Sequence, residues 1–328
     1  MLGRLKPPTR LVVASAAALA LGAPAVLAAC AQRAESRATA LERAPVTTTT
    51  STSSTTSTTI APTTTTAPVD IFALRPPAPG ADPIALAAQI ATAESTIRDP
   101  AASLEATAAA ALAQQVAYRQ LGVHPEWEPA VLAALPEGLR RTAELNAAAR
   151  REFRAMHTSP AQEMPAWRIA PPAPSEELMA AYLAAEAEFA IPWSYLAAIN
   201  LVETGMGRIR GTSTAGAQGP MQFIPSTWAA YGAGGDINDT HDAIMGAARY
   251  LAANNGAVDI DNALYRYNHS DRYVRGVKIY ADLIAEHPRA FTGYYHWGVW
   301  YFTAHGDIYL PVGYEEMARI PVADYLAR

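Results

Sequence analysis

The segment Pro192–Glu203 has the pattern of a helix that carries one carboxylate at the end of an apolar stripe. Leu196, Ile199 and Glu203 are spaced by three and four residues, so they share one helical face. Apolar surroundings raise the pKa of a carboxyl group and keep it protonated. A protonated carboxyl can act as the general acid that breaks a glycosidic bond, whose alkoxide leaving group is poor. Taken alone, the helix favours the alternative that Glu203 is a solvated helix end.

The segment that follows Glu203 favours the interpretation that Glu203 is a general acid. It contains five glycines between residues 205 and 219 and then continues as the run Gly219-Pro220-Met221-Gln222-Phe223-Ile224-Pro225-Ser226-Thr227-Trp228. Glycines let the backbone approach a ligand closely. Gln222 offers hydrogen-bond donors and acceptors, and Trp228 offers a flat apolar face for a sugar. A structural turn needs few of these properties, whereas a carbohydrate groove uses all of them.

Four sequence elements in this order resemble the lytic murein transglycosylases of the lysozyme-like superfamily. They are Glu203-Thr204-Gly205, the run from Gly216 to Trp228, the segment from Asp242-Ala243-Ile244 through Arg249-Tyr250-Leu251, and Tyr267-Asn268. The resemblance covers roughly residues 180–285, about a third of the chain. Residues 1–174 and the far C-terminus lie outside it.

The resemblance implies a helical domain that cleaves the β-1,4 bond between N-acetylmuramic acid and N-acetylglucosamine in peptidoglycan glycan strands. Glu203 occupies the position of the family's catalytic glutamate, which protonates the leaving oxygen and then, as a carboxylate, takes a proton from the muramic C6 hydroxyl. That hydroxyl closes onto C1 and gives a 1,6-anhydro sugar. The N-acetyl group of the substrate stabilises the intermediate, so the family departs from the two-carboxylate scheme of most glycosidases.

The resemblance also predicts substrate-binding residues around Glu203. Met221 and Gln222 match pocket residues near the cleaved bond, and Tyr267 and Asn268 match residues beside the glutamate. The predicted substrate-binding set is Thr204, Met221, Gln222, Phe223, Trp228, Tyr267 and Asn268. Thr204 stands where the family often has Ser, and Pro220 stands where many relatives have Ala or Leu. Neither departure removes a chemical function.

Two other reaction schemes remain open at the level of sequence. A lysozyme-like hydrolase would use water in place of the C6 hydroxyl, and four aspartates could position that water: Asp236, Asp239, Asp242 and Asp271. A catalytically silent module would only bind glycan strands or scaffold division proteins. The intact set of Glu203, Gln222 and Tyr267-Asn268 argues against the silent module.

Metal and cofactor sites are not predicted. The run Asp236-Ile237-Asn238-Asp239 resembles the start of a calcium loop, but His241 replaces the glycine at position six and Ala247 replaces the glutamate at position twelve. We interpret these acids as loop and helix-cap residues. The seven histidines lack metal-ligand spacing, and the single cysteine excludes an internal disulfide and a cysteine-based zinc site.

The composition fits a folded, mainly α protein that does not bind nucleic acid. Of the 328 residues, 50% are hydrophobic and 17% are charged, which is enough apolar material for a sizeable core. The formal net charge is −5, and the basic residues form no dense run. This distribution argues against nucleic-acid binding through a basic face.

The first thirty residues have the features of a targeting signal. Residues 1–29 combine a basic start with a short, broken apolar run, which is typical of a secretory signal. The run ends in Leu27-Ala28-Ala29-Cys30, which resembles a bacterial lipoprotein signal site. The resemblance implies that Cys30 is lipidated and becomes the N-terminus of an extracytoplasmic protein anchored to the cell membrane. The alternative is an unmodified thiol.

The remaining chain divides by composition. Residues 30–80 predict a disordered tether, since 13 Thr and 4 Ser fall within the 24 residues from Pro45 to Pro68. Residues 81–160 are Ala-rich and predict helices over 84–97, 101–121 and 139–157. They show no chemical constellation, so we interpret them as a support or spacer that could contact cell-wall or division proteins.

The catalytic half should follow a Pro-rich linker at residues 161–174. Helical spacing, caps and glycine stops place the lysozyme-like domain over 175–287, with helices at 175–190, 192–203, 242–254, 262–267 and 271–286. The tail, residues 288–328, is rich in aromatic side chains. Packing against the helical core is the favoured interpretation of these side chains, and stacking platforms for glycan are the alternative.

Overall fold

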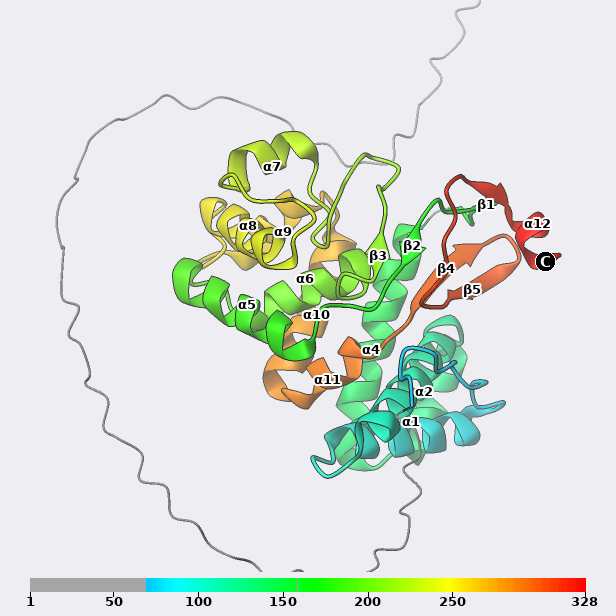
Figure 1. Ribbon diagram of the computed structural model, residues 1–328. Helices are drawn as coiled ribbons and strands as arrows, with labels where there is room; N and C mark the ends of the chain where they lie inside the picture. Colours follow the sequence, from blue (N-terminus) through cyan, green and yellow to red (C-terminus); the bar gives the residue numbers. More distant parts are fainter. Residues whose placement is uncertain (1–68, 158) are drawn as a thin grey trace, which may run out of the picture. The chain divides into compact units, whose positions relative to one another are not determined.

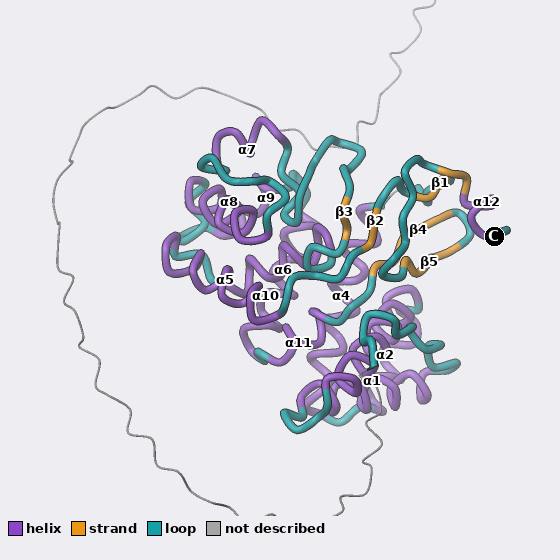
Figure 2. Tube along the Cα trace, in the orientation of Figure 1, coloured by secondary structure: helices purple, strands orange, loops and turns teal. Residues whose placement is uncertain are grey.

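The computed structural model describes residues 69–157 and 159–328, which are mainly helical (Figure 1). The predicted signal segment, Cys30 and the Thr/Ser-rich stretch up to residue 68 lie outside the described residues. Within the described part, every helix is too short or too polar to span a bilayer. Helices dominate the trace in Figure 2, and the short strands gather near the C-terminus.

The N-terminal region folds into a set of packed helices. Its elements are α1 (Pro83–Arg98), α2 (Leu104–Val123), the 3₁₀ turn η1 (Pro125–Trp127), α3 (Glu128–Ala134) and α4 (Glu137–Met156). Helix α1 begins where the Asp82 side chain accepts hydrogen bonds from two backbone N–H groups of the first turn, and Ser103 caps α2 in the same way. The structure confirms the three helices predicted here and adds α3.

A buried carboxylate ties α1 to α2. Glu94 accepts hydrogen bonds from Gln114 (2.8 Å) and from the Tyr118 hydroxyl (2.5 Å), and Arg98 donates to it from the next turn of α1 (3.1 Å). Such a group is tolerated in the core because its oxygens are hydrogen-bonded and its charge is paired.

The second half forms a helical layer around α6. Its helices are α5 (Ser175–Phe189), α6 (Trp193–Thr204), α7 (Pro225–Tyr231), α8 (Thr240–Ala253), α9 (Ile260–Tyr267) and α10 (Asp271–Glu286). Helix α6 is buried on nearly all sides and packs against α5, α8 and α10. It ends at Gly205, whose left-handed backbone (φ +60°) closes the helix. The five predicted helices are confirmed, and α7 is additional.

The two helical sets share one hydrophobic core. Leu86 of α1, Ala147 of α4, Ile199 of α6 and Tyr280 of α10 belong to the same buried cluster. Helix α4 packs against α2 on one side and α10 on the other, as Figure 1 shows. The N-terminal helices are therefore continuous with the catalytic half rather than a separate spacer.

The segment predicted as a linker is built into small antiparallel ladders. Strand β1 (Glu163–Met164) pairs with β6 (Ile320–Pro321), and β2 (Arg168–Ile169) pairs with β3 (Ile209–Arg210). Met164 and Ile169 are buried in a second cluster with Val299, Leu310 and Tyr314. Met164 and Ile169 thus anchor residues 161–174 to a core, so the segment predicted as a Pro-rich linker is part of the folded structure. Runs of two residues are too short to give an alternating pattern.

The C-terminal segment adds one helix, a hairpin and a last turn. Its elements are α11 (Arg289–Tyr295), β4 (Val299–Thr303), β5 (Gly306–Leu310) and α12 (Val322–Leu326). Phe291, Tyr294 and Trp297 are buried in the main core, which supports the packing interpretation of this aromatic tail. Trp300 on β4 is only partly buried.

The predicted tether ends earlier than expected. Residues 69–80 belong to the described unit, and the Gly80 N–H donates to the Gln89 side chain of α1 (2.7 Å). Gly80 lies so close to the backbone around Leu86 that a Cβ atom would overlap it. The C-terminal boundary of the predicted tether, placed at residue 80 from composition, is therefore wrong, because Pro-rich composition does not show whether a segment packs.

Replacing Ile169 by alanine tests whether residues 161–174 are part of the core. Ile169 is 1% exposed, so Ile169→Ala should lower the free energy of unfolding by about 3 kcal/mol. Ile84→Ala is the control, since Ile84 is 64% exposed on α1 and should change stability little. Urea unfolding followed by circular dichroism measures both. Equal stability of Ile169→Ala and wild type would mean that the segment is a loose connection.

Candidate active site

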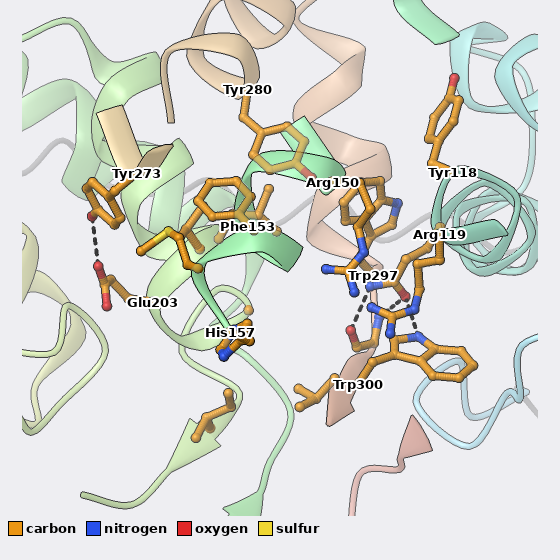
Figure 3. Close-up of a pocket in the computed structure, with 18 of the residues that line it drawn as sticks. Tyr118, Arg119, Arg150, Phe153, His157, Glu203, Tyr273, Tyr280, Trp297 and Trp300 are labelled. Atoms are coloured by element: carbon orange, nitrogen blue, oxygen red, sulfur yellow. Dashed lines mark hydrogen bonds between the residues drawn. The ribbon is translucent and has the colours of Figure 1, made fainter. Parts of the chain in front are cut away.

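Glu203 lies in the last turn of α6 at one end of a cavity of about 400 Å³ (Figure 3). The cavity walls come from α2, α4, α6, α10 and the β4 strand, so both helical sets contribute. Glu203 is the only carboxylic residue that lines this cavity in the described part of the chain. Its side chain is packed by protein on most sides and is partly exposed to the cavity.

Tyr273 holds the Glu203 side chain from the first turn of α10. Its hydroxyl donates to Glu203 Oε1 at 2.7 Å, the contact drawn as a dashed line in Figure 3. The ring of Tyr267, at the end of α9, stacks on the Tyr273 ring with centroids 6.4 Å apart. The Tyr267 hydroxyl donates to the Met221 carbonyl at 2.6 Å and thereby joins α9 to the glycine-rich loop. The two tyrosines therefore fix the Glu203 carboxyl from one side.

Burial controls the acidity of Glu203. Loss of water raises the pKa of its carboxyl group to about 7, and the hydrogen bond from Tyr273 opposes part of this rise. None of the salt bridges among the described residues reaches Glu203, so no cation stabilises its charge at close range. A carboxyl group with a pKa near neutrality can donate a proton and later accept one at the same pH.

Thr204 fixes the glycine-rich loop rather than facing the cavity. It is fully buried, and its hydroxyl donates to the Pro220 carbonyl (2.6 Å) and accepts from the Gly207 N–H (2.9 Å). The amide of Asn200 also donates to the Pro220 carbonyl (3.0 Å). Thr204 therefore positions the residues around Glu203, and its predicted direct contact with substrate disagrees with this burial.

Several side chains of the Pro220–Trp228 run that were predicted to contact substrate pack against the protein. Met221 and Phe223 are buried, and the Phe223 ring contacts the rings of Trp228 and Tyr267 edge to face. The Trp228 indole packs closely against Gly232 and Gly246, where a Cβ atom on either glycine would meet the ring. Trp228 therefore has a packing role, but its side chain is partly exposed. Its predicted role as a sugar platform remains a prediction.

Gln222 differs from its neighbours. Its backbone takes a left-handed conformation (φ +51°), and its side chain is partly exposed while its amide donates to the Gly219 carbonyl (3.0 Å). Strained non-glycine residues of this kind cluster at functional sites. Gln222 does not line the cavity that holds Glu203, nor do Met221 and Phe223. Their predicted contacts with substrate remain predictions.

The structure brings Asn268 into the cavity and adds residues that the sequence did not indicate. Asn268 lines the cavity together with Glu203. Tyr267 does not line the cavity, and its ring stacks on that of Tyr273. Tyr273 is not among the residues predicted from the sequence to lie beside Glu203. Many other wall residues come from outside the motif region: Gln115, Tyr118, Arg119, Arg150, Phe153, Met156, His157, Trp297 and Trp300. Nothing in the local sequence links them to Glu203.

The four aspartates considered for a hydrolase lie away from this cavity. Asp239 caps α8 by accepting from the Asp242 N–H (2.9 Å), and Asp242 accepts from the Asp236 N–H (2.9 Å). Asp271 stands in the first turn of α10. These roles match the predicted loop and cap functions. Asp239, His241 and Asp242 approach within 4.8 Å, but they are mostly exposed and engaged in the cap.

The buried carboxyl should make stability depend on pH. Its folded pKa, about 7, lies above the unfolded value of 4.5, so the folded protein binds more protons in this window. The free energy of unfolding should therefore fall by about 3 kcal/mol from this group as pH rises through the window. Glu203→Gln should lack that fall and be the more stable protein at pH 8. Thermal unfolding of both proteins at pH 4.5, 6 and 8 measures the difference in their stability. If the stability of wild type and of Glu203→Gln changes with pH in the same way, the raised pKa of Glu203 is contradicted.

Comparison with known proteins identifies the region around this site. Residues 181–281 match the family model described as "Transglycosylase SLT domain". No curated protein and no solved structure matches the chain. The matched residues include Glu203, the glycine-rich loop, Tyr267-Asn268 and Tyr273, which are the elements that build the carboxyl site described above. The match of residues 181–281 therefore supports a lytic transglycosylase domain of the lysozyme-like superfamily and, with it, an enzyme that acts on peptidoglycan.

Proposed function

We propose that this protein cleaves the β-1,4 bond between N-acetylmuramic acid and N-acetylglucosamine and leaves 1,6-anhydro ends. The observation that carries the proposal is a single carboxyl group, Glu203, with a pKa near 7 and no second carboxylic residue on the described cavity wall. A lone carboxyl suits a reaction in which the substrate's own N-acetyl group and C6 hydroxyl replace a second carboxylate.

Glu203 acts twice in this scheme. Its protonated form gives a proton to the glycosidic oxygen as the bond to C1 breaks. The Tyr273 hydroxyl, 2.7 Å from Oε1, then stabilises the carboxylate charge as it develops. The carboxylate next removes the proton from the C6 hydroxyl, whose oxygen bonds to C1. Glu203 is protonated again, and no water is consumed.

The competing schemes have less support. A hydrolase would need a positioned water, and the candidates Asp236, Asp239, Asp242 and Asp271 do not line the cavity. A silent binding module would not need a desolvated carboxyl, which costs folding stability at neutral pH. We therefore favour the transglycosylase over both.

We also propose that the protein works outside the cytoplasm, attached to the cell membrane through lipidated Cys30. The support is the sequence Leu27-Ala28-Ala29-Cys30 after a basic and apolar start. A Thr/Ser-rich stretch of this length would let the enzyme reach glycan strands at a distance from the membrane. Contacts of residues 81–160 with cell-wall or division proteins stay a prediction.

The products of digestion test the reaction. The wild-type protein should release muropeptides that are lighter by one water than hydrolysed muropeptides, and Glu203→Gln should reduce their release by at least about a hundredfold. Mass spectrometry of digested peptidoglycan distinguishes the cases. Hydrated products that disappear in Glu203→Gln would indicate a hydrolase that uses the same acid. Unchanged release by Glu203→Gln would contradict the assigned role.

The pH profile tests how Tyr273 acts. Its hydrogen bond lowers the pKa of Glu203, so Tyr273→Phe should raise that pKa. Because the general acid must be protonated, the alkaline limb of kcat/KM should move to higher pH in Tyr273→Phe. Tyr267→Phe is the matched control, since its hydroxyl donates to Met221 instead. An unmoved limb in Tyr273→Phe would show that the tyrosine only packs.

A further inference from the structure

A cluster of positive charge lies at the end of the cavity away from Glu203, where Arg119 and Arg150 line the wall. Figure 3 shows Glu203 and Tyr273 at one side, His157 between, and Arg119, Arg150 and Trp300 at the other side. The cluster consists of Arg119 on α2 with Arg150 and Arg154 on α4, and the carboxylate nearest to them is Asp307 on β5. Three guanidinium groups thus share one carboxylate.

The three arginines are not equally paired. Arg119 and Arg154 both hydrogen-bond to Asp307, the latter at 2.8 Å. Arg150 lies 3.9 Å from Asp307 Oδ2 and makes no side-chain hydrogen bond with the described residues. Its side chain is only 24% exposed, and it borders the cavity. Arg150 is therefore a largely desolvated cation whose donors open onto the space shared with Glu203.

The surroundings hold Arg150 in this position. Gly122 of α2 leaves room for its aliphatic part, because a Cβ atom at Gly122 would come within 2.8 Å of Arg150 Cγ. Arg119 stacks over the Trp300 ring at 4.6 Å, and the Trp300 indole N–H donates to Gln115 (3.2 Å). Gly122 thus seats the aliphatic part of Arg150, and the stack on Trp300 restricts the neighbouring Arg119 guanidinium before any ligand arrives.

The pKa shifts of Arg150 and His157 are those expected in a buried place with an excess of positive charge. Burial lowers the pKa of Arg150, and burial together with Arg150 and Arg154 lowers the pKa of His157. His157 is thus mainly neutral at pH 7 and does not add a charge. An anion entering this space would offset the excess of three guanidinium groups over one carboxylate, and a bidentate carboxylate matches the geometry of a guanidinium.

We propose that Arg150, beside Arg119 and Trp300, binds a carboxylate of the peptide stem that peptidoglycan carries on its muramic residues. This inference rests on the proposed function. The N-acetylated sugars of the glycan are uncharged, so the stem supplies the anions of a stem-bearing strand. Its glutamate, diamino acid and terminal alanine present free carboxylates at increasing distances along the stem from the sugar. The subsite makes the enzyme prefer glycan strands that bear stems over strands from which stems are removed.

The experiment compares three soluble glycan substrates at low salt. The first carries intact stems, the second carries stems whose carboxylates are amidated, and the third is stripped of stems by an amidase and keeps only the lactyl carboxylate. The enzymes are the full-chain wild type, Arg150→Met and Arg141→Met. Arg141 is the matched control because it pairs with Glu286 at the surface and is 65% exposed. The readout is kcat and KM for release of anhydro products.

We expect the wild type and Arg141→Met to cleave intact strands with a kcat/KM about tenfold or more above that for amidated strands, mainly through KM. Arg150→Met should cleave both equally, at the lower value. On stripped strands all three enzymes should show that same low value. If Arg150→Met keeps the preference for intact strands, or if the wild type has none, the proposal is wrong. Efficient cleavage of stripped strands that needs Arg150 would assign the anion to the lactyl carboxylate and overturn the stem assignment.

Two further measurements separate this inference from the proposed function and from misfolding. Binding of the free stem tetrapeptide to the Glu203→Gln protein should be lost when Arg150→Met is added, and this readout needs no catalysis. Absence of binding to Glu203→Gln itself would overturn the inference, whereas absence of anhydro products from the wild type would overturn the function alone. Arg150→Met should unfold at the same or a higher temperature than wild type, because it removes a largely desolvated cation that is only distantly paired, while Asp307 keeps Arg119 and Arg154.

Discussion

The site depends on removing water from Glu203 without supplying a cation in its place. The raised pKa near 7 follows from this burial, and the Tyr273 hydroxyl limits the rise. Each surrounding element maintains this condition. Helix α6 is buried on nearly all sides, Gly205 ends it where the carboxyl meets the cavity, and Thr204 fastens the next loop to Pro220. The cost in stability at neutral pH is a cost of catalytic function.

The cavity unites two parts of the chain that sequence composition separates. Helices α2 and α4 form the wall opposite the motif region, and α4 shares the main core with α10. The C-terminal β4 strand, with Trp300 on it, forms another wall, and its hairpin packs with the segment predicted as a linker. A cavity assembled from distant segments can place other groups of the protein beside a ligand that reaches Glu203. Arg150, which shares Asp307 with two other arginines, is the clearest of these groups.

Local patterns predicted the helices because helix positions depend on short-range spacing, with apolar residues three and four apart and Gly or Pro at the ends. Glu203 was singled out by the order of four motifs between residues 203 and 268, since its own helix favoured a solvated end. The same reasoning misjudged Thr204, because a hydroxyl serves packing as readily as binding. Tyr273 and Arg150 could not be assigned from sequence, because their roles arise only when α10 and α4 pack beside α6. Two-residue strands such as β1 and β2 leave no periodic signal.

The central claim is that Glu203 carries a proton near neutral pH, and a direct titration of its carboxyl tests it. Carbon-13 NMR of protein labelled at glutamate carboxyls, with Glu203→Gln used to assign the signal, would follow this group alone. If burial raises the pKa of Glu203, its carboxyl signal should titrate with a midpoint at about pH 7 in the wild-type protein. A midpoint near 4.5, the ordinary value for a glutamate, would mean that water reaches Glu203 freely and would contradict the account.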